Sequence, residues 1–162
     1  MKSPYSRIIG VDLGKYGGIA CVRNDLSVDF LSSMPIVDKK YDIATIQAIL
    51  ETYSANSILV IEDIYGTKNR GTNILPLAEA KGIFKSLAMI NSIPCFFVTA
   101  RQWKHQLNLT KQNLQPETIK EKKQRSVNLA QQLFPSQNLS LKNNGAAEAL
   151  LIAYYGFKFL EM

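Results

Sequence analysis

Three acidic residues of this chain lie in apolar stretches, where a carboxylate needs a partner. Asp12 follows the run IIGV, Glu62 follows ILVI, and Glu148 lies inside GAAEALLIA. Acidic side chains are seldom buried alone, and closely spaced carboxylates repel each other unless a cation or a proton lies between them. Because Mg²⁺ takes oxygen ligands in proteins, the three acids together indicate a divalent-cation site.

Two of these acids also have simpler explanations. Asp12 is followed by Gly14, Gly17 and Gly18, so its carboxylate could initiate a turn. Glu148 lies one turn into a predicted helix, where a negative charge could simply complement the helix dipole. All three acids stand at the end of a predicted element within apolar sequence, and this shared placement favours a common role.

The composition is that of a soluble globular protein with a basic surface. The chain has 162 residues, 46% hydrophobic and 20% charged, with a net charge of +6. No apolar run approaches the roughly 18 residues of a membrane span, and the N-terminus lacks the apolar core of a signal peptide. We therefore expect one domain, residues 1–162, that is intracellular and cytoplasmic, and the charge suits a polyanionic partner.

The chain offers few metal ligands other than carboxylates. His105 is the only histidine, and Cys21 and Cys95 are isolated in separate strand-like runs. These two cysteines argue against a zinc site and fit a reducing compartment. A metal site in this chain must therefore rest on acidic residues.

The hydrophobic pattern predicts an α/β fold that can bring the acids together. The expected strands are 7–13, 17–23, 26–33, 58–62 and 94–99, and the expected helices are 43–54, 73–91, a short one around Trp103, 117–133 and 145–160. The first three strands read as an antiparallel meander, and helical crossovers make the later strands parallel. If the first and fourth strands are neighbours, Asp12 and Glu62 end at one edge, about 4.8 Å apart. Small residues around Glu148 would let the last helix approach this edge closely.

Four segments in order, GVDLGKYGGIA, LVIED, VTARQWK and GAAEALLIAYYG, resemble the RuvC-like Holliday junction resolvases. The likeness is greatest to the small branch of phages, poxviruses and plastids. It implies a ribonuclease H-like fold, with a mixed five-stranded sheet (three antiparallel strands, then two parallel) flanked by helices. It also implies paired symmetric nicks in four-way DNA junctions that leave 5′-phosphates.

The resemblance further implies a metal site made by Asp12, Glu62 and Glu148, with two Mg²⁺ or Mn²⁺ ions and no organic cofactor. Two such ions, about 3.5–4 Å apart, can activate the attacking water and stabilise the leaving oxygen. The family places a further aspartate about five residues before the final acid, whereas this chain has Asn143 there and Asn144 beside it. We include Asn143 among the expected metal-binding and catalytic residues.

An amide oxygen at this position can ligate a metal ion but adds no negative charge. Three explanations for Asn143 remain open. The chain is a natural variant with a weak second metal site, or it was inactivated by an Asp→Asn change, or it binds junctions without cutting them. A loop asparagine is otherwise ordinary, since asparagine is common in turns.

The expected DNA contacts come from several segments. Between residues 101 and 125 the charged residues are mostly basic, although a charge run can equally be a solvated helix face. The loop 63–71 follows Glu62 directly and could grip or wedge a junction. The candidate DNA-binding residues are Lys15, Tyr65, Lys68, Arg70, Thr72, Asn73, Lys104, Lys111, Lys120, Lys123 and Lys142. For Trp103 a place in the core is the preferred interpretation over a stacking role, and Lys142 is equally well explained as a solvent-facing lysine.

A four-way junction has near two-fold symmetry, so two symmetric cuts call for a C2 homodimer. The helix expected at 73–91 carries more apolar surface than one face needs, which fits the helix through which the family dimerises, although a broad core face would look the same.

Two other functions compete with this interpretation. The nearest is a ribonuclease H-like nuclease that acts on RNA–DNA hybrids, and the second is a junction-binding protein without catalysis. A sugar kinase or chaperone-type ATPase also begins with a VDLG-like loop, but it needs two such domains, which 162 residues do not hold.

Overall fold

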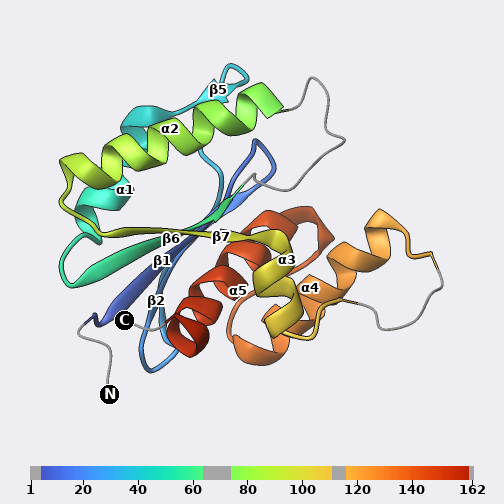
Figure 1. Cartoon of the computed structure of the whole chain (residues 1–162). Helices are drawn as coiled ribbons and strands as arrows, with labels where there is room; N and C mark the ends of the chain where they lie inside the picture. Colours follow the sequence, from blue (N-terminus) through green and yellow to red (C-terminus); the bar gives the residue numbers. More distant parts are fainter. Residues whose placement is uncertain (1–4, 64–73, 111–115, 161–162) are drawn as a thin grey trace.

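The computed structural model describes residues 5–63, 74–110 and 116–160, and a central sheet organises them (Figure 1). Its strand order is β3-β2-β1-β6-β7, with β1, β2 and β3 antiparallel and β1, β6 and β7 parallel. The strands are β1 (Arg7–Asp12), β2 (Gly18–Arg23), β3 (Val28–Ser33), β6 (Ser57–Asp63) and β7 (Cys95–Thr99). This arrangement confirms the predicted mixed sheet and makes β1 and β6 neighbours in its centre.

Helices cover both faces of the sheet (Figure 1). On one side lie α1 (Ile43–Thr52) and α2 (Ile74–Ile90), and on the other lie α3 (Ala100–Gln106), α4 (Ile119–Leu133) and α5 (Asn144–Phe159). None of the helices in the described part of the chain is long and apolar enough to cross a membrane.

Several element ends differ from the prediction for local reasons. The third strand begins at Val28 rather than at residue 26, because Leu26 has a φ of 67° in the preceding turn. Helix α4 begins at Ile119, since Thr118 and Glu121 form a capping box at its start. The small hairpin of β4 (Ile36–Val37) and β5 (Lys40–Tyr41) was not predicted, as two-residue strands leave no periodic pattern.

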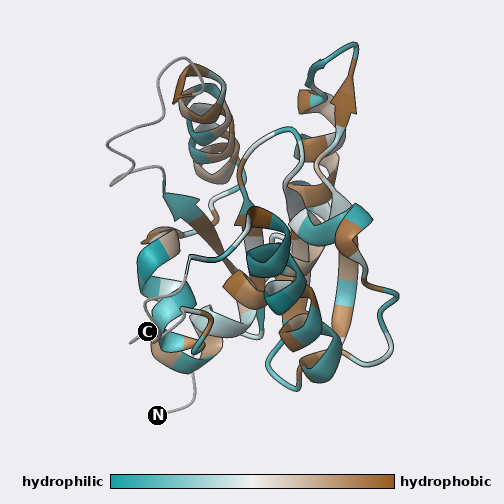
Figure 2. Cartoon of the chain, turned by 90° about the vertical axis from the view of Figure 1, so that its right-hand side faces the viewer, coloured by the Kyte–Doolittle hydropathy of each residue, from teal (hydrophilic) through white to brown (hydrophobic). Residues whose placement is uncertain are grey.

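Alternation along the strands divides the core into two layers and sets the direction of each acid. In β6, Ile58 and Val60 pack in the layer of α4 and α5, whereas Leu59 and Ile61 pack in the layer of α1 and α2. Because side chains alternate along a strand, Glu62 continues the first series and Asp63 the second. Figure 2 shows β6 as hydrophobic along its length with a hydrophilic tip, where these two acids lie.

Helix α5 lies unusually close to β1 and β2. A Cβ atom on Gly10 would come 2.2 Å from the carbonyl oxygen of Ala149 and 2.7 Å from the backbone nitrogen of Ala153. A Cβ on Gly145 would likewise come 2.2 Å from the carbonyl oxygen of Tyr16. These contacts leave no room for a side chain, so the glycines allow α5 to rest directly on β1, which ends at Asp12, and on the turn that leads into β2.

Candidate metal-binding active site

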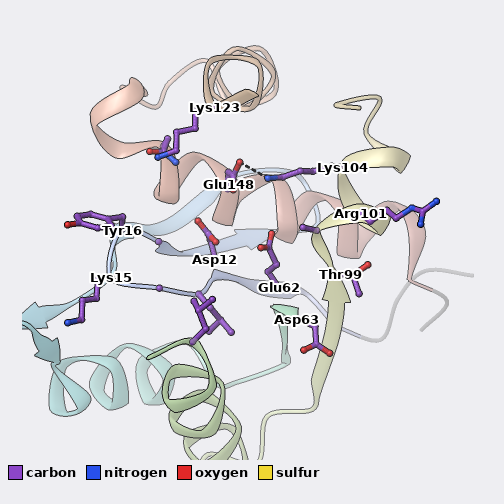
Figure 3. A pocket seen from close by; sticks show the side chains of 16 residues that line it. Asp12, Lys15, Tyr16, Glu62, Asp63, Thr99, Arg101, Lys104, Lys123 and Glu148 are labelled. Carbon is purple, nitrogen blue, oxygen red and sulfur yellow. Dashed lines mark hydrogen bonds and ion pairs between the residues drawn. The ribbon is translucent and has the colours of Figure 1, made fainter. Parts of the chain in front are cut away.

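The structure brings the three predicted acids together at the ends of β1, β6 and the first turns of α5. Asp12, Glu62 and Glu148 each offer a carboxylate oxygen, and these oxygens lie within 4.8 Å of one another (Figure 3). Asp12 and Glu62 directly follow Val11 and Ile61, the last pair in the parallel register of β1 and β6. Glu148 is only 8% exposed, and the other two are partly buried. We call these three residues the carboxylate cluster.

The carboxylate cluster is short of positive charge. Burial, followed by the nearby Glu62 and Glu148, raises the pKa of Asp12 well above its ordinary value, and Lys104 and Lys123 only partly oppose this rise. Without a cation the cluster therefore favours a proton on Asp12. Oxygen ligands that are crowded, partly buried and under-neutralised are the donor set that a hard divalent cation requires, so these residues fit Mg²⁺ or Mn²⁺.

Two residues hold the Glu148 carboxylate in place. Nζ of Lys104 lies 3.0 Å from Oε1 of Glu148, and Oγ of Ser126 donates a hydrogen bond of 2.9 Å to the same oxygen. Burial lowers the pKa of Lys104, but Glu148 and Glu62 outweigh it, so the pKa is raised overall. In this structure the ammonium group of Lys104 contacts the carboxylate cluster, and its predicted contact with DNA stays a prediction.

Trp103 holds the carboxylate of Glu62 in place by a hydrogen bond. Its side chain is completely buried, which confirms the preferred prediction that it belongs to the core. Its Nε1–H also donates a hydrogen bond of 2.8 Å to Oε2 of Glu62. This bond was not predicted, and its only signal in the sequence was the position of Trp103 beside Lys104 in the segment RQWK.

A cavity of about 700 Å³ opens over the carboxylate cluster (Figure 3). Besides the three acids, its lining includes the basic residues Lys15, Arg101, Lys104 and Lys123 and the aromatic residue Tyr16, which is 90% exposed. Lys15 and Lys123 were predicted as DNA contacts, whereas Arg101 and Tyr16 were not. Basic and aromatic side chains around an acidic centre suit a phosphodiester strand whose phosphates approach bound cations.

Two other predicted DNA-binding residues lie elsewhere in the described part of the chain. Lys120 and Lys142 are exposed and do not line this cavity. The remaining candidates fall outside the described residues, and they are Tyr65, Lys68, Arg70, Thr72, Asn73 and Lys111. The loop expected to grip the junction therefore stays a prediction.

Asn143 does not line this cavity, and its side chain is bonded within its own turn. Its Oδ1 accepts a hydrogen bond of 2.7 Å from the backbone nitrogen of Ser140, and its Nδ2 donates one of 3.0 Å to the carbonyl oxygen of Asn138. These bonds cap the 3-10 turn η2 (Leu141–Asn143). The neighbouring Asn144 lines the cavity, one helical turn before Glu148. In this structure Asn144, not Asn143, lines the cavity, and a metal-binding role of Asn143 stays a prediction.

A fourth acid of the cavity, Asp63, is directed differently. It follows Glu62 in β6, so its side chain belongs to the other face of the sheet, and Figure 3 shows it turned away from the three acids. There its Oδ1 lies 2.8 Å from Nζ of Lys81 in α2. Asp63 therefore links β6 to α2 and does not take part in the carboxylate cluster.

Comparisons with known proteins find similarity in structure but not in sequence. No protein-family model and no curated protein sequence matches the chain. Solved structures of RuvC proteins match with probability 1.00. The RuvC of T. thermophilus in complex with a Holliday junction substrate has a TM-score of 0.66 and 13% identity, covering 93% of this chain and 94% of that one. A Thermus thermophilus RuvC structure has a TM-score of 0.64 and 14% identity, covering 93% and 95%. The chain therefore has the RuvC fold along nearly its whole length, as its motifs predicted.

Proposed function

We propose that this chain is a metal-dependent endonuclease that resolves four-way DNA junctions by paired symmetric nicks, leaving 5′-phosphates. The observation that carries the proposal is the carboxylate cluster, Asp12, Glu62 and Glu148, which stands at the end of the central strands in a chain with the RuvC fold. One of the similar structures is a RuvC bound to a Holliday junction substrate, and we extend that substrate class to this chain.

The carboxylate cluster would hold the metal ions, for which we propose two Mg²⁺ or Mn²⁺. Ions bound there supply an activated water and stabilise the departing oxygen during phosphodiester hydrolysis. The role of the chain is to keep three carboxylates close together in a partly buried place. Lys104 and Ser126 orient Glu148, and Trp103 contacts Glu62.

The rim of the cavity would bind the DNA strand. Lys15, Arg101 and Lys123 can contact phosphates, which gives affinity that depends on salt and carries little sequence information. Tyr16, 90% exposed at the same rim, offers an aromatic face on which an unpaired base can stack. Contacts to the backbone and to one stacked base depend on the shape of the DNA and not on its sequence. Such contacts suit an enzyme that is specific for junctions.

A C2 homodimer would supply the two active sites that paired cuts need. On α2, Leu75 and Met89 are each 74% exposed and Ile90 is 70% exposed. Large apolar side chains at this exposure suit a surface that a second copy of the chain covers.

The experiment that tests the proposed substrate compares three labelled nucleic acids in Mg²⁺ or Mn²⁺: a four-way junction, an RNA–DNA hybrid and a linear duplex. We expect cleavage of the junction in preference to the other two, and loss of cleavage in the Glu148→Gln variant. Preferential cleavage of the hybrid would identify a ribonuclease H-like activity instead. Tight junction binding without any cleavage, by wild type as by Glu148→Gln, would identify a binding protein.

A further inference from the structure

Trp103 has two properties that together suggest more than packing. It is the only tryptophan in the chain, and its side chain is completely buried in the core layer formed with α4 and α5. A buried indole needs an acceptor for its N–H group. In this chain the acceptor is Oε2 of Glu62, a member of the carboxylate cluster, at 2.8 Å.

The indole bond constrains how Glu62 presents its carboxylate. A glutamate side chain reaches its terminal group through three rotatable bonds, and the last of these is soft. The rigid, fully packed indole fixes one carboxylate oxygen in space and thereby sets the rotation of the group. A carboxylate oxygen has several acceptor positions, so this bond is compatible with metal coordination.

The bond is also part of a larger arrangement in α3. Thr99 and Gln102 form a capping box that fixes the start of this short helix directly after β7. The adjacent residues Trp103 and Lys104 then reach two different acids, Glu62 and Glu148. Through them, one turn of α3 sets the position of two of the three carboxylates.

We propose that Trp103 is a positioning residue that holds Glu62 in its metal-binding orientation. This inference rests on the proposed function, because it concerns the same site. Groups that hydrogen-bond to metal ligands typically contribute about 10–100-fold to metal affinity. A residue that only fills space would contribute to stability and leave metal affinity unchanged.

The first experiment observes the indole directly. A ¹⁵N HSQC spectrum of the full chain contains a single indole cross-peak, since Trp103 is the only tryptophan. We expect this peak to move in a saturable manner when Mg²⁺ is added to the wild type. In Glu62→Gln the indole peak should have a different chemical shift in the metal-free spectrum. The midpoint of its Mg²⁺ titration should lie at a concentration at least about tenfold higher than in the wild type.

The matched control is the neighbouring acid. Asp63→Asn changes the next residue of β6, which pairs with Lys81 on the other face of the sheet. Its indole peak should respond to Mg²⁺ as in the wild type. The inference would be overturned if the indole peak of the wild type did not shift with Mg²⁺ although the wild type still bound Mn²⁺.

The second experiment measures Mn²⁺ affinity by calorimetry for Trp103→Phe, which retains an aromatic ring but removes the donor. We expect its affinity to fall about 10–100-fold. Phe84→Leu is the control for packing, because Phe84 is equally buried but lies in the opposite core layer. It should lose stability and keep its Mn²⁺ affinity.

A double-variant cycle shows whether Trp103 acts through Glu62. In a Glu62→Gln background, Trp103→Phe should reduce Mn²⁺ affinity little further. Equal Mn²⁺ affinity of wild type and Trp103→Phe would overturn the inference while leaving the proposed function intact. A wild type that binds no Mn²⁺ would overturn the proposed function. If Trp103→Phe does not fold, the indole spectra of the wild type, Glu62→Gln and Asp63→Asn still test whether Trp103 responds to Mg²⁺ through Glu62.

Discussion

At the scale of single residues, Asp12 carries an electrostatic cost in the metal-free protein. Its pKa is raised in the folded chain by burial and by Glu62 and Glu148, so the folded state binds protons more readily than the unfolded state. The contribution of Asp12 to the stability of the metal-free protein therefore falls as the pH rises from the ordinary pKa of an aspartate through the raised one. An asparagine at this position has no such dependence.

We predict that Asp12→Asn is more stable than wild type at neutral pH in EDTA by roughly 1–3 kcal/mol. For a chain of this size, each 1 kcal/mol corresponds to about 2–4 °C in Tm. The difference should vanish below the ordinary pKa of an aspartate, and Mg²⁺ should stabilise only the wild type strongly. Thermal melts from about pH 3 to 8 measure this, and a less stable variant at neutral pH in EDTA would contradict the assignment.

Asn144 gives a second prediction at this scale. It lines the cavity one turn before Glu148, so Asn144→Asp adds a carboxylate beside the cluster. We expect Mn²⁺ affinity to rise on the order of tenfold, as charged ligands strengthen hard-cation sites. Asn143→Asp is the control, since its side chain caps η2 and should leave Mn²⁺ affinity unchanged. Calorimetry on both variants checks this, and a gain for Asn143→Asp alone would restore the original assignment.

The sequence was enough to select the three acids, because each interrupts an apolar run. It did not reveal how they are held. Trp103 is 41 residues from Glu62, and Ser126 is 22 residues from Glu148, and no local pattern reports bonds across such separations. In this structure Asn144 rather than Asn143 lines the cavity, because the direction of the Asn143 side chain depends on the cap of a turn rather than on helical spacing.

At the scale of elements, the close approach of α5 to β1 determines where Glu148 lies. We predict that Gly10→Ala destabilises the chain by roughly 1–3 kcal/mol, because the new methyl group would press on the backbone of α5 at Ala149. Mn²⁺ affinity should fall as well, since Glu148 directly precedes Ala149. Chemical unfolding and calorimetry measure the two effects.

The control for this prediction is Gly82→Ala in α2. A Cβ there meets nothing in the chain within 4 Å, so the change should be neutral or stabilise the helix by about 0.5–1 kcal/mol. Unchanged stability and metal binding in Gly10→Ala would mean that α5 is free to shift and does not set the geometry of the cluster.

The main elements were predictable because their apolar residues repeat with a clear period. Alternation in β1 and β6, together with the neighbouring positions of these strands, explains why Asp12 and Glu62 share a face. The hairpin of β4 and β5 was missed because it rests on two-residue strands and on positive φ angles at Asp38 and Lys39, which leave little trace in composition.

At the scale of the whole molecule, the paired cuts of the proposed function call for two copies of the chain. We predict that Met89→Glu converts a dimer to a monomer by placing a charge on the exposed apolar side of α2. The control is Ile119→Glu in α4, which changes an isoleucine that is also 74% exposed and should leave the dimer intact. Light scattering after size exclusion measures both, and a wild-type monomer at micromolar concentration would contradict the expected assembly.

We propose that the carboxylate cluster holds the divalent cations with which this protein cuts DNA junctions. The most direct measurement is cleavage of a strand-labelled four-way junction in Mg²⁺, comparing wild type with Glu62→Gln under conditions where both bind the junction. We predict paired nicks at symmetric positions for the wild type, none in EDTA, and a loss of at least about 100-fold in the variant. Equal cleavage by Glu62→Gln, or wild-type cleavage that persists in EDTA, would contradict the claim.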